Sequence, residues 1–522
     1  MYVVVAGDEV LPLGSSGVTG SPDLAAVVRE MEGERPRWVW ADTREDYPPL
    51  LRAGVRVARC HDLALTEGLL LGFEGRHGEP RSVRAAHARL SGLPVPDERP
   101  SEPDTLFAPE PPSAGMVAEV LADQLRRIEA LPDPGRFRLL VAAESAGALI
   151  AAEMGHDGMP WRRDVHDALL SDLLGPRPVH GMRPARLQAL ADEVSAAFGH
   201  PVNPDSVQQL VKAFKGAGVA LKSTRSWELK QVDHPAVAPL LAYKELARLH
   251  SFHGWTWADQ WVRDGRFRPE YVVGGVVSGR WATSGGGALQ IPKVMRRVVV
   301  ADDGWTLVVA DAAQLEPRVL AAMAGDVGLA RAAGEIDLYS ALAQAFGGDR
   351  DHAKIAMLSA MYGGTSGDAP KLLAMMRQRF PRAYQFVEDA AKAGEEGRLV
   401  RSWLGRTCPP PSERWRGLVS GPEGGRAARD RGRFTRNFVV QATAAEWALA
   451  LMAVLRGLLP DPAGLVFFQH DEVMVHCPLE QAPEVIGAVS AAAEEATRLM
   501  FGRTPVRFPM EAVAVSSYSD AK

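Results

Sequence analysis

Acidic residues follow two strongly apolar runs in the C-terminal half of the sequence. Asp311 follows the run 307–310, and Asp471 with Glu472 follows the run 465–468 inside an apparent hairpin. A carboxylate at the end of a buried strand is costly unless it is paired or binds a metal. If the two strands are neighbours, Asp311 and Asp471 can share two Mg²⁺ ions about 3.5–4 Å apart, as in phosphoryl transfer, with Mn²⁺ as a substitute. Taken singly, each site is better explained as a strand-end cap or a polar turn.

The segment 349–364 predicts a helix with a second chemical face. Four side chains recur at four-residue steps and therefore share an arc of about 120° on one face. They are Arg350, Lys354, Leu358 and Tyr362. The two cations suit the phosphates of a nucleoside triphosphate, and the aromatic ring suits a stacked base pair. Gly363 and Gly364 end the predicted helix.

Composition limits the class of protein. With 522 residues the chain is too long for one core, and 46% hydrophobic with 24% charged residues is typical of a globular protein. The most apolar stretch, Ala442–Leu459, contains Glu446 and Arg456 and is interpreted as a buried helix. The N-terminus lacks the basic region of a secretory signal, and the three dispersed cysteines suit neither disulfides nor zinc. We therefore expect a protein of the reducing cytoplasm.

A net charge of −5 does not by itself indicate nucleic-acid binding, but two segments concentrate basic residues. One cluster comprises Lys212, Lys215, Lys222, Arg225 and Lys230. The other comprises Arg414, Arg416, Arg426, Arg429, Arg431, Arg433 and Arg436. Each could be a solvated helix face or a track for phosphates.

Hydrophobic periodicity predicts the elements that carry these residues. Short strands (YVVVAG, RWVWAD, VRVARC) mixed with helices predict a small α/β unit up to about residue 93. A Pro-rich acidic stretch at 94–115 predicts a linker. Helices dominate from 116 to 250, from 317 to 393 and from 437 to 458, with strands at YVVGGVV, TLVVADAAQ and LVFFQHDEVMVHC.

Several motifs in this order resemble those of the family A DNA polymerases, the family of bacterial DNA polymerase I. DAAQLEPR resembles the first palm motif, RDHAKIAMLSAMYG the fingers helix, and QHDE the palm hairpin. SGRWATSGGGALQIPK, RFTRNFVVQATAAEW and YKELARLH are similar to further palm and thumb segments. The resemblance covers roughly residues 136–522. It implies a right-hand polymerase fold of mixed α+β and α/β type: an antiparallel palm sheet, helical fingers and thumb, and a preceding RNase H-like exonuclease-type domain.

The resemblance implies a role for each matching residue. Asp311 and Asp471 would hold the metals with Glu472 beside them, and Lys354 would donate a proton to pyrophosphate. The implied nucleotide-binding residues are Arg350, Lys354, Leu358, Tyr362, Glu316, Gln314 and Tyr339, with Glu316 excluding the ribose 2′-hydroxyl. The implied DNA-binding residues are Arg280, Lys244, Arg248, Arg433, Asn437, Gln441, His470 and Arg318. The partners would be primer-template DNA and deoxynucleoside triphosphates.

The sequence departs from the family pattern in two regions. Ala312 and Ala313 replace Tyr-Ser in the first palm motif. In the fingers, Leu358 stands where Phe or Tyr is usual, and Tyr339 stands where the family often has His. These changes could weaken nucleotide binding or loosen sugar selection, but they remove no metal ligand.

The N-terminal segment resembles a proofreading domain that has lost its chemistry, which requires four acids around two metals. Asp42 and Asp46 match its middle motif and Asp62 a structural position, but the D-x-E strand is absent. In the third motif, Glu119 and Asp123 are offset and Val120 occupies the expected Asp position. We therefore predict an inactive 3′–5′ exonuclease.

The expected domains are an exonuclease-like unit, a thumb, a divided palm and inserted fingers. Their predicted boundaries are 1–135, 136–265, 266–325 with 428–522, and 326–427. The length leaves no room for a 5′-nuclease domain, so a monomer working with a separate nuclease and ligase in repair or gap filling is expected. The alternatives are a retained exonuclease, a single-subunit RNA polymerase, which Glu316 and QHDE disfavour, and a non-catalytic DNA-binding scaffold.

Overall fold

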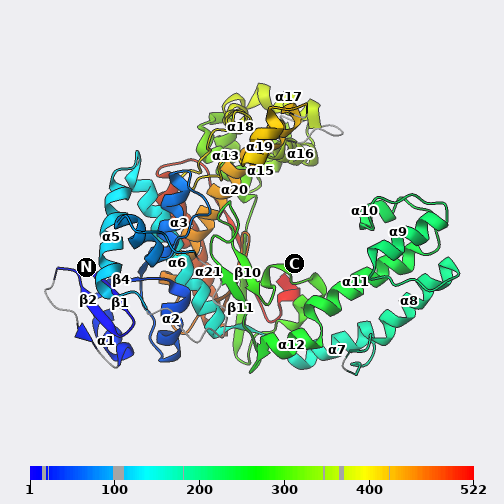
Figure 1. Cartoon of the computed structure of the whole chain (residues 1–522), viewed down its shortest axis with the longest axis horizontal. Helices are drawn as coiled ribbons and strands as arrows, with labels where there is room; N and C mark the ends of the chain where they lie inside the picture. The colour runs from blue at the N-terminus through cyan, green and yellow to red at the C-terminus, as the bar shows by residue number, and fades with distance from the viewer. Residues whose placement is uncertain are drawn as a thin grey trace. The chain divides into compact units, whose positions relative to one another are not determined.

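The computed structural model describes residues 1–14, 19–20, 23–97, 111–179, 181–344, 347–363, 369–422 and 424–521. Most of the predicted linker and Gly364 lie outside these ranges. The chain divides into two compact units (Figure 1). The first unit contains residues 1–157, 270–284 and 304–514, and the second contains 158–269, 285–303 and 515–522.

The first unit begins with a five-stranded sheet in the order β3-β2-β1-β4-β5. Its strands are β1 (Tyr2–Ala6), β2 (Glu9–Pro12), β3 (Thr19–Gly20), β4 (Arg37–Trp40) and β5 (Cys60–Asp62). β1, β4 and β5 run parallel, and β2 turns back antiparallel to β1. The helices of this region are α1 (Leu24–Met31), α2 (Thr43–Arg52), α3 (Leu63–Phe73), α4 (Val83–Leu90), α5 (Ala114–Glu129) and α6 (Pro134–Asp157). This arrangement agrees with the predicted small α/β unit.

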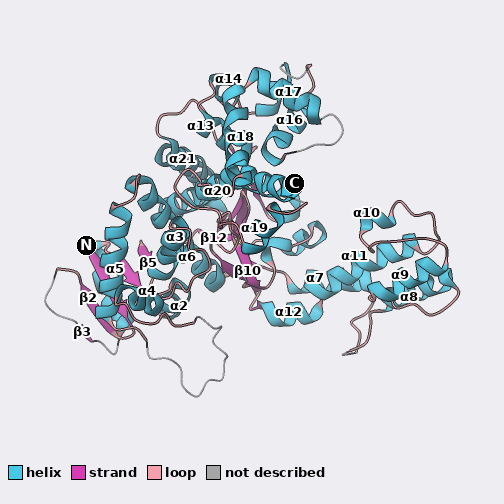
Figure 2. Cartoon of the chain, turned by 45° about the horizontal axis from the view of Figure 1, so that its top comes forward, coloured by secondary structure: helices cyan, strands magenta, loops and turns pink. Residues whose placement is uncertain are grey.

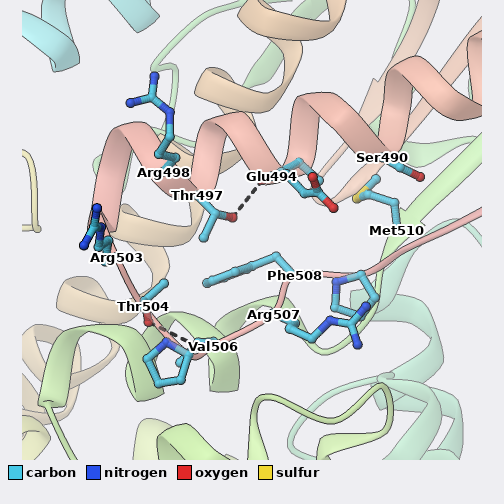
Figure 3. A pocket seen from close by; sticks show the side chains of 14 residues that line it. Ser490, Glu494, Thr497, Arg498, Arg503, Thr504, Val506, Arg507, Phe508 and Met510 are labelled. Atoms are coloured by element: carbon cyan, nitrogen blue, oxygen red, sulfur yellow. Dashed lines mark hydrogen bonds between the residues drawn. The ribbon is translucent and has the colours of Figure 1, made fainter.

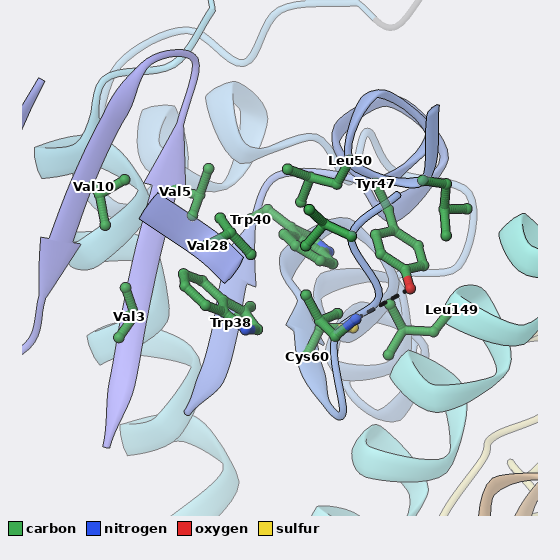
Figure 4. Close-up of a cluster of buried hydrophobic side chains, with 13 residues drawn as sticks. Val3, Val5, Val10, Val28, Trp38, Trp40, Tyr47, Leu50, Cys60 and Leu149 are labelled. Atoms are coloured by element: carbon green, nitrogen blue, oxygen red, sulfur yellow. Dashed lines mark hydrogen bonds between the residues drawn. The ribbon is translucent and has the colours of Figure 1, made fainter. Parts of the chain in front are cut away.

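One core of this sheet is aromatic and includes part of α6 (Figure 4). Trp38 and Trp40 are completely buried, and Tyr47 stacks on Trp40 with ring centroids 5.6 Å apart. Leu149 of α6 belongs to the same cluster, and Glu153 of α6 accepts a hydrogen bond from the Tyr47 hydroxyl at 2.7 Å. The first unit therefore continues to residue 157, whereas the sequence placed a domain boundary at 135.

The second sheet of the first unit, whose strand β12 is labelled in Figure 2, has the order β12-β13-β11-β14. Its strands are β11 (Trp305–Ala312), β12 (Gly464–Gln469), β13 (Glu472–Pro478) and β14 (Met510–Val515). β13 lies antiparallel to both β11 and β12, with a two-residue turn between β12 and β13. Two short strands, β9 (Glu270–Val272) and β10 (Ala282–Gly285), form a separate pair.

Helices α20 (Gly424–Leu458) and α21 (Ala482–Phe501) belong to the first unit, and α21 packs on β11 and β13 of the second sheet. α20 is the one helix in the described part of the chain that is long and apolar enough to cross a membrane. Its apolar window is 83% buried inside the protein, which identifies it as a core helix. Its charged Glu446 is completely buried, and Arg456 forms an ion pair with Glu153 of α6. The predicted buried helix is thus present and begins earlier than expected.

A helical segment connects β11 to α20. Its helices are α13 (Leu315–Ala324), α14 (Val327–Ala332), α15 (Leu338–Ala343), α16 (Arg350–Tyr362), α17 (Ala369–Arg379), α18 (Pro381–Glu395) and α19 (Glu413–Val419). The Asp349 side chain caps α16 by accepting from the amides of Asp351 and His352, and Gly363 ends the helix with φ 68°.

The second unit is mainly helical. Its helices are α7 (Arg163–Leu174), α8 (Ala185–Phe198), α9 (Val207–Gly216), α10 (Ser226–Leu229), α11 (Val237–His253) and α12 (Trp255–Trp261). Short strands β6 (Met159–Pro160), β7 (Val262–Arg263) and β8 (Arg266–Phe267) form its sheet. Phe214, Leu229 and Leu240 lie in its helical core.

Two strand predictions are wrong in their extent. In VRVARC, only Cys60 lies in a strand, because β5 covers Cys60–Asp62. In YVVGGVV, the strand β9 ends at Val272, and the chain then turns through Val273 and Gly274, which has φ 60°. Alternating apolar residues indicate burial in both segments, but burial alone does not supply a neighbouring strand edge.

Candidate active site

The three predicted carboxylates lie together at one end of the second sheet. In the antiparallel register, Asp311 of β11 is opposite Glu472 of β13. The Ala312 amide donates a 3.1 Å hydrogen bond to the carbonyl of Asp471. Asp311 and Asp471 are partly exposed, whereas Glu472 is only 4% exposed. The structure therefore brings together the residues that the sequence singled out.

This donor set fits a divalent cation of the magnesium type. Two partly exposed aspartates on adjoining strand ends offer hard oxygen ligands. Across the described ranges, no group of three His, Cys, Asp or Glu residues is arranged to hold a metal ion.

His470 forms the turn beside Asp471. Its backbone has φ 60°, a left-handed conformation uncommon for a residue with a side chain. Burial lowers the pKa of His470, and the nearby Arg280 guanidinium lowers it further while Glu316 opposes the change. The imidazole is therefore neutral near pH 7.

Glu316 is the centre of a polar network in front of the sheet. Its carboxylate forms an ion pair with Arg280 and accepts a hydrogen bond from the Tyr362 hydroxyl. Gln441 of α20 also bonds to Tyr362. Burial, followed by the Glu316 carboxylate, raises the pKa of Tyr362, so the phenol stays protonated. Residues from four distant segments thus meet with Glu316 at their centre.

The predicted face of α16 is formed, with its two cations in different surroundings. Arg350 forms a 2.9 Å ion pair with Asp337, and its guanidinium carbon lies 5.6 Å from the centre of the Tyr339 ring. Burial raises the pKa of Tyr339 to about 12. Lys354 is exposed, while Leu358 is only partly exposed.

Asp337 is a residue that sequence analysis missed. Partial burial alone would raise its pKa, but hydrogen bonds from Arg350 and Ser340 hold the pKa below its usual value. It also accepts from the Gln314 side-chain amide at 3.1 Å. Its position just before an apolar helix signals an N-cap, but not its link to Arg350.

Arg318 does not occupy a DNA-binding position in this structure. It is completely buried, and its Nη1 donates to the carbonyls of Ala333 and Arg507 at 2.7 and 2.9 Å. Burial lowers its pKa to about 10. Gln314 likewise uses its side chain inside the fold, accepting from the Leu338 amide at 2.9 Å. The predicted DNA contact of Arg318 is therefore corrected to a role in holding the chain around α13.

Three predicted DNA-binding residues follow one another at four-residue steps along α20. Arg433 is exposed, pairs with Asp430 and lies against Gly363 at the end of α16. The side-chain oxygen of Asn437 is buried and has no hydrogen-bond partner in the described structure. Gln441 completes the row beside Tyr362. The row therefore connects the end of α16 with the Glu316 network.

Lys244 and Arg248 lie on α11 of the second unit. Lys244 donates to the Thr224 hydroxyl at 2.9 Å, and burial lowers its pKa. Arg248 is exposed. Their predicted role on the DNA backbone stays a prediction.

Several acids of the N-terminal α/β region form hydrogen bonds or ion pairs with neighbouring residues. Asp62 is completely buried and accepts from the amides of Thr43 and Leu65, both at 2.8 Å. Burial raises the pKa of Asp62 to about 7 and that of Asp46 to about 6. In the third-motif region, Asp123 forms ion pairs with Arg126 and Arg127, and Glu119 contacts His87. Val120 is buried, as a packing residue would be.

A separate groove of about 700 Å³ lies between α21 and the segment that follows it (Figure 3). Thr497 and Phe508 line it, with Arg503 and Arg507 on the segment after α21. The three carboxylates of the second sheet are not among its lining residues. It is therefore distinct from the candidate active site.

Comparison with known proteins identifies relatives of this arrangement. Residues 182–513 match the model of DNA polymerase family A. A thermostable DNA polymerase I of Thermus filiformis is 28% identical over 355 residues, covering 59% of this chain and 41% of the relative. That of Thermus thermophilus is 27% identical over 432 residues, covering 72% and 50%. The chain thus spans half or less of these relatives.

A solved structure has the same fold. The POL domain of Pol1 from M. smegmatis, solved in complex with DNA primer-template and dNTP, superposes with a TM-score of 0.73. The match covers 96% of this chain and 90% of that domain at 19% sequence identity. The predicted fold class is therefore confirmed.

Proposed function

The chain belongs to DNA polymerase family A, and we propose that it is a template-directed DNA polymerase that extends a primer with deoxynucleotides. The observation that carries this proposal is the meeting of Asp311 and Asp471 at adjoining strand ends. The Glu316 network and the cationic face of α16 supply the remaining chemistry. The partners named for the M. smegmatis domain, primer-template and dNTP, are the partners proposed here.

In the proposed reaction, the primer 3′-oxygen bonds to the α-phosphorus of the nucleotide and the bond to pyrophosphate breaks. Phosphoryl transfer of this kind depends mostly on positioning and charge neutralisation. Arg350 would leave Asp337 to bind the triphosphate, and the exposed Lys354 would donate a proton to the departing pyrophosphate. Tyr362 and Leu358 would lie against the new base pair.

Asp311 and Asp471, with Glu472 beside them, would hold two Mg²⁺ ions. Bound there, the ions would lower the pKa of the 3′-hydroxyl and stabilise charge on the pyrophosphate oxygens. Glu316 would occupy the space needed by a ribose 2′-hydroxyl, because its carboxylate is already fixed by Arg280 and Tyr362.

We also propose that the N-terminal sheet has no 3′–5′ exonuclease activity. Asp123 is engaged with two arginines, and Val120 is an apolar residue where a ligand would be needed. A role in gap filling or repair in the cytoplasm, as a monomer alongside a separate 5′-nuclease and ligase, completes the proposal.

One gel tests both activities. A 5′-labelled primer on a longer template is incubated with Mg²⁺, with and without the four deoxynucleotides. We expect extension with nucleotides and an intact primer without them. Shortening of the primer would contradict the inactive exonuclease, and the absence of extension with either Mg²⁺ or Mn²⁺ would contradict the polymerase and favour a DNA-binding scaffold.

A further inference from the structure

The loop between β9 and β10 carries Arg280, and two glycines of this loop lie directly against charged side chains. Gly274 and Gly279 both have positive φ, 60° and 81°. A Cβ atom at Gly274 would lie 2.4 Å from Oε1 of Glu144, and one at Gly279 would lie 2.4 Å from Nε of Arg406. No side chain fits at either distance, so the loop backbone rests on these two residues.

Glu144 and Arg406 form a buried ion pair beneath the loop. Nη2 of Arg406 lies 2.7 Å from Oε2 of Glu144, and their side chains are only 9% and 3% exposed. Glu446 of α20 is completely buried nearby, where burial raises its pKa to about 7 and Arg406 opposes the rise. Glu144 comes from α6 and Arg406 from the segment between α18 and α19. The pair therefore fixes the loop to segments far away in sequence.

The residue on the other side of Arg280 is fixed as well. Trp281 is buried and packs edge-to-face on Phe468 of β12 and on Tyr271, with ring centroids 5.0 and 5.3 Å apart. Arg280 therefore has an immobile neighbour on each side, and its own guanidinium reaches Glu316. Its direction is set by the loop, because the flanking residues cannot shift independently of the core.

We infer that Glu144 and Arg406 are positioning residues for Arg280, and that this buried pair sets how the protein recognises the minor groove of the primer-terminal base pair. The inference rests on the proposed function and on the family resemblance of residues 278–293, which places Arg280 where the family contacts that groove. A small displacement of a positioned group can reduce a reaction by roughly a hundredfold, so the pair can control function without touching DNA.

A matched control pair also has its acid on α6. Glu153 lies nine residues after Glu144 on α6, and Oε1 of Glu153 lies 2.6 Å from Nη2 of Arg456 on α20. These side chains are 10% and 18% exposed, and they support Tyr47 and the chain before β5. Loss of this pair removes a comparable buried interaction without reaching the Arg280 loop.

The test compares two primers in single-turnover extension. One primer ends in adenine, and the other ends in 3-deazaadenine, which lacks the N3 acceptor in the minor groove. The wild-type protein is expected to extend the analogue primer about tenfold more slowly, because a hydrogen bond to a charged donor is lost. In Arg406→Met, Arg406→Lys and Gly279→Ala the ratio is expected to approach one, whereas Arg456→Met is expected to keep the wild-type ratio.

Arg406→Lys protects the test against misfolding, which thermal unfolding detects, because it leaves no buried acid without a cation. A wild-type ratio in the folded variants of the Arg280 loop, or an equal loss in Arg456→Met, would overturn the inference. A wild-type protein that extends both primers equally would also overturn it while leaving the polymerase intact, and a wild-type protein that extends neither would overturn both.

A double variant separates positioning from general damage. If Arg406 acts through Arg280, adding Arg406→Met to Arg280→Ala should lower extension of the adenine primer by less than about twofold further. Independent effects would multiply instead. Multiplication of the two single effects would contradict the inference.

Discussion

The two large sheets of the first unit both place acids at strand ends, but they surround these acids differently. Asp62 at the end of β5 is completely buried and receives hydrogen bonds from Thr43 and Leu65. Asp311 lies at the end of β11, and Asp471 lies in the turn just before the paired strand β13. Both aspartates are partly exposed. An acid after an apolar strand is therefore ambiguous until its surroundings are known. In the first sheet Asp62 is part of the buried fold, and in the second sheet Asp311 and Asp471 remain accessible to solvent.

The largest expected effect on primer extension comes from replacing Asp311 or Asp471. Asp311→Ala and Asp471→Ala should each lower the rate of primer extension by roughly a thousandfold or more, because each removes a ligand for charge neutralisation in the transition state. Primer-template binding, measured by fluorescence anisotropy, should change little. Substantial residual extension by either variant would refute the metal-ligand assignment.

The corresponding change in the N-terminal sheet should affect stability and leave chemistry intact. Asp62→Ala leaves the Thr43 and Leu65 amides without their acceptor and should lower the free energy of unfolding by about 2 kcal/mol. Extension below the unfolding temperature should be unchanged. Urea unfolding measures the effect, with Asp62→Asn as the milder control. A loss of primer extension without a loss of stability would contradict the purely structural role of Asp62.

A third prediction concerns Glu316, which lies in front of the second sheet and is proposed to select the nucleotide sugar. Glu316→Ala frees Arg280 and Tyr362 and opens space beside the nucleotide sugar. The preference for deoxynucleotides over ribonucleotides should fall by about tenfold, a value typical of one lost steric or hydrogen-bonding contact. Competing incorporation of dATP and ATP measures it, and an unchanged preference would assign sugar selection to another residue.

The smallest expected effect concerns the pH dependence of Asp46. Burial raises its folded-state pKa to about 6, above the usual value of 3.8 for an exposed aspartate, so between about pH 4 and 6 the folded chain keeps a proton that the unfolded chain has lost. Stability from this group therefore falls as pH rises through that window. The free energy of unfolding of the wild-type protein should therefore decrease between about pH 4 and 6. Because the Asp46 side chain is partly exposed, we expect Asp46→Asn to make this decrease smaller by only about 1 kcal/mol, as measured by urea unfolding at several pH values. An unchanged profile would contradict this assignment.

Much of the site follows from residues close together in the chain. The four-residue step from Arg350 to Tyr362, the Asp349 cap and the strands before Asp311 and Asp471 all depend on local periodicity and capping. The hairpin between β12 and β13 could be predicted for the same reason. The short strands β5 and β9 could not, because strand length depends on a neighbour elsewhere in the chain.

The sequence alone determined which residue types stand on one helix face and at which strand ends, because these are properties of a few neighbouring residues. Tertiary structure alone decided that Arg318 is buried, that Glu316 joins Arg280 to Tyr362, and that the first unit includes α6. It also decided that Arg406 pairs with Glu144, 262 residues away. Such pairs arise when packed elements exclude water, so that each buried charge needs a partner wherever the chain supplies one.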